Sequence, residues 1–146
     1  MSRSTLVDPR GLRFAAAITA VVLAVVLLTG NGWVLAAQAA VFAVGAFAGL
    51  RRSPYGLAFR KLVAPRLSPP THREPEAAPR FAQSLGLAFA IVGVIGYASG
   101  ITWLGYTATA LAWAAAFLNA AFGFCLGCET YLLFRRAFST SKGVTA

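Results

Sequence analysis

Apolar side chains fill four long stretches of the chain, and short polar segments separate these stretches. A run of about 18 to 20 apolar residues, at a helical rise of about 1.5 Å per residue, matches the roughly 30 Å of hydrocarbon in a bilayer. The pattern therefore predicts an all-α membrane protein with four transmembrane helices in two hairpins. The expected spans are residues 12–29, 33–50, 81–99 and 103–122.

The connections within the two hairpins are short and uncharged. Residues 29–32 leave room only for a tight helical turn, and residues 100–103 form the second turn. Gly86, Gly93 and Gly96 lie along the third span. They predict close contact with neighbouring helices, because packing of small residues replaces the hydrophobic effect in lipid.

Residues 51–80 join the two hairpins and differ sharply from them in composition. Ser53-Pro54 suits the start of a helix, and the residues that follow predict a short interfacial helix up to Val63. Five prolines between Ala64 and Pro79 predict an extended loop over the membrane surface. We expect a single integral membrane domain over residues 1–146.

Composition supports a membrane protein. Hydrophobic residues make up 58% of the chain and charged residues 12%, against roughly 25% charged residues in soluble proteins. The net charge of +9 is typical of nucleic-acid binding, but the basic residues lie at the ends of the apolar runs instead of on one solvated face. No nucleic-acid partner is therefore expected.

The distribution of basic residues predicts the topology. Three Lys or Arg residues precede Phe14, where the first uninterrupted apolar run begins, seven lie in residues 51–80, and three follow the fourth run, which ends at Phe134. By the positive-inside rule, both termini and the 51–80 loop lie in the cytoplasm. Residues 37–39 resemble a signal-peptidase site, but a second apolar run continues past them, so the first run is expected to be retained.

The fourth apolar run is too long to be one straight span. The 34 residues from Ile101 to Phe134 contain a single charge, and as one helix they would reach about 51 Å. Gly123 and Gly127 are the expected position of a break. We expect an interfacial segment over residues 123–138, with a helix that begins near Cys125.

The chain's two cysteines, Cys125 and Cys128, lie in a C-x-x-C spacing within this segment. At a helix start, unpaired backbone N–H groups would stabilise the Cys125 thiolate, so Cys125 is the expected attacking thiol and Cys128 the resolving one. Glu129 follows directly, as a proton shuttle or as the ion-pair partner of a loop arginine. The alternative is that both cysteines are small packing residues, in a continuous helix that gives neither a dipole advantage.

Other polar residues suggest binding or packing roles. Asn119, Gln38 and Gln83 are intramembrane polar residues, and Asn119 is expected to form an interhelical hydrogen bond or to line a polar cavity. A zinc site would need His72 with the cysteines and Glu129, a weak pattern, so no metal is expected. Without a nucleotide-binding motif, no cofactor is expected either. The basic residues expected to dock a partner or anionic lipid are Arg51, Arg52, Arg60, Lys61, Arg66, Arg135 and Arg136.

Four segments carry a resemblance to a known family. They are VDPRGLRFAAAIT at residues 7–19, RRSPYGLAFRKLVAPRL at 51–67, RFAQSLG at 80–86 and NAAFGFCLGCETY at 119–131. Together they resemble a family of small bacterial membrane proteins described as domain of unknown function 4395. The resemblance implies a four-helix protein of the bacterial inner membrane, with a soluble thioredoxin-like or sulfurtransferase (rhodanese-like) partner. A looser analogy is to quinone-linked membrane thiol oxidoreductases, which use a second cysteine pair that this chain lacks.

These patterns favour a membrane thiol/disulfide redox or sulfur-relay protein that uses Cys125 and Cys128 at the cytoplasmic face. The alternative is a non-enzymatic membrane scaffold or assembly subunit with packed cysteines. A transporter is the third hypothesis, since four helices would have to form a homo-oligomer to enclose a path. Whether the protein is an enzyme stays open between these hypotheses.

Overall fold

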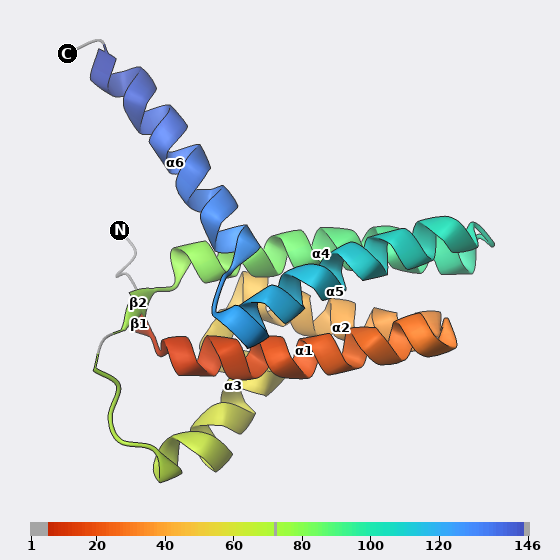
Figure 1. Ribbon diagram of the computed structural model, residues 1–146, viewed down its shortest axis with the longest axis horizontal. Coiled ribbons are helices and arrows are strands. Elements are labelled where there is room, and N and C mark those ends of the chain that lie inside the picture. Colours follow the sequence, from red (N-terminus) through yellow and green to blue (C-terminus); the bar gives the residue numbers. More distant parts are fainter. Residues whose placement is uncertain (1–5, 72, 145–146) are drawn as a thin grey trace.

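The computed structural model describes residues 6–71 and 73–144, and this part of the chain is almost wholly α-helical (Figure 1). Four helices lie along a common direction: α1 (Pro9–Thr29), α2 (Gly32–Ala43), α4 (Ala77–Ala98) and α5 (Thr102–Phe122). Two further helices, α3 (Pro54–Ala58) and α6 (Leu126–Val144), lie at one end of this bundle. There β1 (Leu6–Val7) and β2 (Glu74–Pro75) form a short antiparallel pair.

Two of the described helices, α1 and α4, are long and apolar enough to cross a membrane. The bent pair of α5 and the first part of α6 makes a third if it counts as one broken span. The second apolar helix ends at Ala48, after a π-helical turn over Val44–Ala48. It stops short of Leu50 because Gly49 adopts a φ of 106°, which interrupts helical geometry.

The first hairpin turn forms as the sequence predicts. Gly30 ends α1 with a left-handed φ of 66°, and Asn31 begins α2 by accepting hydrogen bonds from the backbone N–H groups of Trp33 and Val34. A side-chain oxygen at this position satisfies N–H groups that have no partner within the helix. The chain therefore reverses direction within three residues.

The core lies where α1, α2, α4 and α5 meet, and its fully buried side chains include Leu23, Val26 and Leu35. The predicted role of the small residues on α4 is confirmed. A Cβ atom on Gly96 would lie 2.5 Å from the backbone nitrogen of Gly105, and one on Gly93 would lie 2.6 Å from Leu35. Only glycine permits these two helix contacts at this separation.

Two expectations about residues 51–80 need correction. A π-helical turn over Phe59–Val63 and a 3-10 turn over Ala64–Arg66 continue from α3, so the chain becomes extended only at Leu67. Helix α4 begins at Ala77, before the proline-rich segment was expected to end. Pro79 is compatible with this start because it lies in the first helical turn, where N–H groups lack intrahelical partners.

Candidate functional site

The predicted break in the fourth apolar run lies at Gly123. Helix α5 ends there with a left-handed φ of 70°, and the Gly123 N–H donates to the carbonyl oxygen of Asn119 at 2.9 Å. The next helix, α6, leaves at 96° to α5. Figure 1 shows α6 projecting from the bundle. It extends to Val144, beyond the expected end near Phe138.

Cys125 directly precedes α6, in the position that the sequence predicted. Its sulfur accepts a hydrogen bond from the backbone N–H of Cys128 at 3.2 Å, and its Cα lies 5.1 Å from that of Cys128. The two side chains form a disulfide, and both residues are half-buried. The arrangement places one sulfur at the N-terminal end of a helix, where backbone N–H groups stabilise negative charge.

A cavity of about 440 Å³ lies beside the disulfide. Both cysteines, Asn119 and Gln83 contribute to its lining. Much of the remaining wall is apolar and comes from α1, α2, α4 and α5, including Leu12, Ala15, Phe42, Phe89 and Ala112. The two cysteines therefore border a largely apolar space inside the bundle, and they are also partly exposed to the outside of the protein.

Contacts with α4 hold α6 in this position. A Cβ atom on Gly127, between the two cysteines, would lie 2.5 Å from the Cβ of Ala82. Further along α6, the rings of Tyr131 and Phe134 pack on Phe81 with centroids 5.7 and 6.3 Å away. The start of α6 is thus fixed against the bundle by close backbone approach and by aromatic packing.

Glu129 lies in the first turn of α6 and is exposed. Its backbone N–H donates to the carbonyl oxygen of Cys125 at 3.0 Å. Its carboxylate has no ion-paired partner within residues 6–71 and 73–144, so the predicted pairing with a loop arginine does not form there. A negative charge in a first helical turn is favourable in itself, because it faces the positive end of the helix dipole.

The predicted intramembrane polar residues have different environments. Gln38 is buried, and its side-chain oxygen accepts a hydrogen bond from the Tyr55 hydroxyl of α3 at 2.6 Å. Burial raises the pKa of Tyr55, so its hydroxyl stays protonated as the donor. Asn119 and Gln83 line the cavity beside the disulfide. Within the described chain, the Asn119 side chain makes no hydrogen bond to another helix.

The predicted basic residues separate into two groups. Arg51 and Arg60 line a second cavity, next to α3. The others border neither cavity, and all seven are exposed; these others are Arg52, Lys61, Arg66, Arg135 and Arg136. Arg135 lies 6.0 Å from the centre of the Tyr131 ring, a cation–π distance on the surface of α6.

Sequence reasoning missed the polar groups that close the helix ends. Arg13 donates to the carbonyl oxygens of Ala120 and Ala121 at the end of α5. Glu76 is buried, and Arg80 lies one helical turn away with a 3.6 Å ion-pair distance. The four-residue spacing of Glu76 and Arg80 is the sequence signal that could have identified this pair.

Within the described part of the chain, no three His, Cys, Asp or Glu side chains lie together as a set of metal ligands. The zinc pattern weighed from the sequence used His72, which lies outside the described residues. Cys125, Cys128 and Glu129 are close together in the sequence at the start of α6, but they do not form such a set.

These features define a class: an all-α protein with apolar helices that could cross a membrane and a cysteine pair at the start of a helix. The chain belongs to the family described as Domain of unknown function (DUF4395), whose sequence model matches residues 7–136. The match includes both cysteines and the whole helical bundle. Comparisons with curated proteins and with solved structures found no match.

Proposed function

We propose that this protein is a thiol/disulfide redox or sulfur-relay protein of the bacterial inner membrane. The observation that carries the proposal is the position of Cys125, which begins α6, accepts the Cys128 N–H and borders a cavity. A packed structural cysteine needs none of these features. A soluble thioredoxin-like or rhodanese-like protein is the proposed partner.

In the redox reaction, the Cys125 thiolate attacks one sulfur of a partner's disulfide. A mixed disulfide forms, and the partner's other sulfur leaves as a thiolate. The Cys128 thiolate then attacks the Cys125 sulfur, which releases the partner's remaining thiolate and closes the Cys125–Cys128 disulfide. Two electrons pass from this protein to the partner, and the same steps in reverse return them.

In the sulfur-relay reaction, Cys125 carries a persulfide. The Cys125 thiolate attacks the terminal sulfur of a persulfide on the partner, forms a new S–S bond and releases the partner's thiolate. No net oxidation occurs, because one persulfide is exchanged for another. The N–H groups at the start of α6 assist either reaction, since both begin from a thiolate at Cys125.

The proposed arrangement in the membrane has four spans, with both termini and residues 51–80 in the cytoplasm. The supporting observation is that the charged segments gather at one end of the bundle, while both hairpin turns lie at the other end (Figure 1). This distribution follows the positive-inside rule. Helix α2 is the shortest of the four, and it spans the bilayer in this proposal together with its π-helical turn.

Trapping of mixed disulfides tests the function. Cys128→Ser leaves a mixed disulfide at Cys125 without a resolving thiol, so a partner adduct should accumulate on non-reducing gels after acid quenching. Cys125→Ser is the matched control, and it should give several-fold less adduct. If both single variants give equal adducts, the assignment of the attacking thiol is wrong.

A second measurement addresses the redox state and the topology together. A membrane-impermeant maleimide should label the reduced protein in inside-out vesicles and leave it unlabelled in right-side-out vesicles. Oxidation should abolish the labelling. Two results together would establish the scaffold alternative instead: a wild-type cysteine pair that never oxidises, and a Cys125→Ser/Cys128→Ser variant with an unchanged phenotype.

A further inference from the structure

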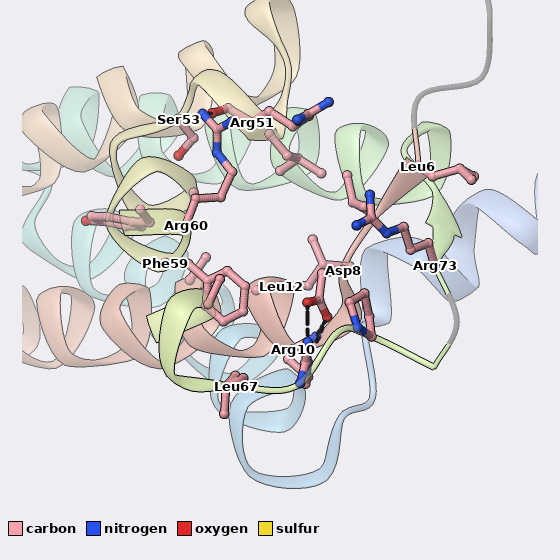
Figure 2. A pocket seen from close by; sticks show the side chains of 18 of the residues that line it. Leu6, Asp8, Arg10, Leu12, Arg51, Ser53, Phe59, Arg60, Leu67 and Arg73 are labelled. Carbon is pink, nitrogen blue, oxygen red and sulfur yellow. Dashed lines mark hydrogen bonds and ion pairs between the residues drawn. The ribbon is translucent and has the colours of Figure 1, made fainter. Parts of the chain in front are cut away.

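A second cavity, of about 360 Å³, lies at the basic end of the bundle. It is enclosed by the start of α1, by α3 and its continuation, and by the extended segment that follows (Figure 2). Five residues line both this cavity and the disulfide cavity, but neither cysteine lines this one; the shared residues are Leu12, Ala15, Thr19, Leu50 and Gln83. Its chemistry is therefore separate from that of the thiol pair.

Arginine side chains surround this cavity. Figure 2 shows Arg51 and Arg60 together on one part of its border, Arg73 beside Leu6 on another part, and Arg10 next to Asp8. Within the described residues, the guanidinium groups of Arg51 and Arg73 have no hydrogen-bonded or ion-paired partner. Arg60 makes one hydrogen bond, to the carbonyl oxygen of Arg51 at 3.0 Å. Most of the N–H donors of these three arginines remain available to a ligand.

The carboxylate among the lining residues is already paired. Asp8 accepts from the backbone N–H of Arg10 and forms an ion pair with its guanidinium at 2.9 Å (Figure 2). The hydrogen bond from the Arg10 side chain lowers the pKa of Asp8, so Asp8 remains charged and its charge is offset by Arg10. Arg51, Arg60 and Arg73 then give the cavity a net positive charge.

The interior of the same cavity is apolar. Leu12, Leu50 and Phe59 line it, and Phe59 is only 4% exposed. A cavity of this size lies in the range of about 300 to 1,000 Å³ that small-molecule sites occupy. An inorganic anion would meet the arginines and leave the apolar wall without a partner. An anion with an attached hydrocarbon chain would contact both.

We propose that this cavity binds an anionic phospholipid, with the headgroup phosphate at Arg51 and Arg60, which are neighbours, and the beginning of an acyl chain against the apolar wall. The position supports a lipid over a soluble phosphate ester. The cavity lies at the basic end of the apolar helices, which in the membrane arrangement proposed above is the depth of the lipid headgroups. A negative net headgroup charge matches the positive border, whereas choline would place a cation beside it.

Titration of the purified full-length protein in a non-ionic detergent tests the site. The ligands are dioctanoyl phosphatidylglycerol, dioctanoyl phosphatidylcholine and inorganic phosphate, with binding followed by native mass spectrometry. We expect saturable binding of one phosphatidylglycerol molecule, binding of phosphatidylcholine weaker by about tenfold, and no competition by equimolar phosphate. Equal binding of the two lipids, or full competition by phosphate, would overturn the proposal.

The structure provides a charge-matched control. Arg51→Gln/Arg60→Gln removes two charges that line the cavity, and Arg52→Gln/Arg66→Gln removes two charges that do not line it; all four side chains are exposed. The cavity variant should bind phosphatidylglycerol about tenfold more weakly, while the control stays within about twofold. Equal weakening would mean non-specific surface attraction and would refute the site. Unchanged circular dichroism of both variants excludes misfolding as the cause.

Discussion

The protein has two sharp corners at the basic end of its bundle, and they are closed by different chemistry. At the first, Gly49 separates α2 from α3 with a φ of 106°, and at the second, Gly123 separates α5 from α6 with a φ of 70°. Each corner follows an apolar helical hairpin and leads into a helical segment with basic residues, which after Gly49 lie in the short helical turns before and after α3 and after Gly123 lie on α6. The same arrangement of hairpin, glycine and following helical segment therefore occurs twice in the chain. The two copies differ in the groups that stabilise the corner.

Polar groups of α4 close the first corner. The Leu50 N–H donates to the carboxylate of Glu76 at 3.3 Å, and Arg80 donates to the carbonyl oxygens of Ala46 and Phe47. These bonds satisfy backbone groups that the interrupted helix leaves without partners. None of them depends on oxidation state.

The second corner has fewer polar contacts and a disulfide. Arg13 of α1 donates to the carbonyl oxygens of Ala120 and Ala121, and the bond between Cys125 and Cys128 lies on the other side of the turn. A reductant can cleave that bond without disturbing the first corner. The comparison teaches that the disulfide lies at the corner with fewer other polar contacts.

The largest expected effect on stability comes from Glu76→Ala. The carboxylate is buried, and its loss leaves the Leu50 N–H without an acceptor and Arg80 without its ion-pair partner. We expect the free energy of unfolding to fall by about 2 to 3 kcal/mol. Thermal unfolding by circular dichroism in detergent measures it.

The matched control for this change is Glu129→Ala at the second corner. Glu129 is exposed, so this substitution should change the free energy of unfolding by no more than about 0.5 kcal/mol. Equal losses from the two variants would show that the buried carboxylate does not distinguish the corners.

The next effect comes from Gly127→Val. A Cβ atom there would lie 2.5 Å from the Cβ and 2.6 Å from the Cα of Ala82, so α6 must move away from α4. We expect the free energy of unfolding to fall by about 1 to 3 kcal/mol, and we expect maleimide to modify the reduced cysteines faster. Ala137→Val, on an exposed part of α6, is the control and should change neither quantity measurably. Unchanged labelling in Gly127→Val would mean that the Ala82 contact does not position the site.

The difference between the corners also explains what the sequence could predict. The need for a break follows from length, because 34 nearly uncharged residues exceed a bilayer's thickness, and the glycines at 123 and 127 indicate where it lies. Hairpin turns at Gly30 and Gly100 follow from local polarity and glycine. These features depend on residues that are close together in the sequence.

The contacts that close the corners could not be predicted in the same way. Arg13 reaches a helix end more than 100 residues later in the chain, and its partners are backbone carbonyls, which carry no sequence signature. The two cavities depend on how four helices pack, and a pattern of apolar residues does not determine that packing. The start of α4 was misplaced because Pro79 reads as a helix breaker, although a first turn accommodates it.

A smaller effect is expected from Arg13→Gln. The change removes hydrogen bonds from a charged donor to the end of α5, where a positive charge also faces the negative end of the helix dipole. Since Arg13 is exposed, we expect the free energy of unfolding to fall by about 0.5 to 1 kcal/mol, and we expect this decrease to be smaller at high salt. The same substitution at Arg136, which borders no helix end, provides the baseline in the same unfolding assay. A larger loss at Arg136 than at Arg13 would contradict the role given to Arg13.

The smallest expected effect is a pH dependence of stability that comes from Asp8, which lines the same cavity as Leu50 next to the first corner. The hydrogen bond from the Arg10 side chain lowers the pKa of Asp8 in the folded protein. A lowered folded-state pKa means that the stabilisation is fully present above the unfolded value of about 3.9 and is lost as the pH falls below it. Asp8→Asn keeps a good helix N-cap while removing the charge. The free energy of unfolding of the wild type should therefore exceed that of the variant by under about 1 kcal/mol at pH 7, and this difference should disappear toward pH 3.

Denaturation of both proteins across this pH range, under oxidising and under reducing conditions, measures the difference. Because the disulfide lies at the other corner, the pH-dependent difference should be the same in both conditions, and a difference that appears only in the oxidised protein would show that the two corners are coupled.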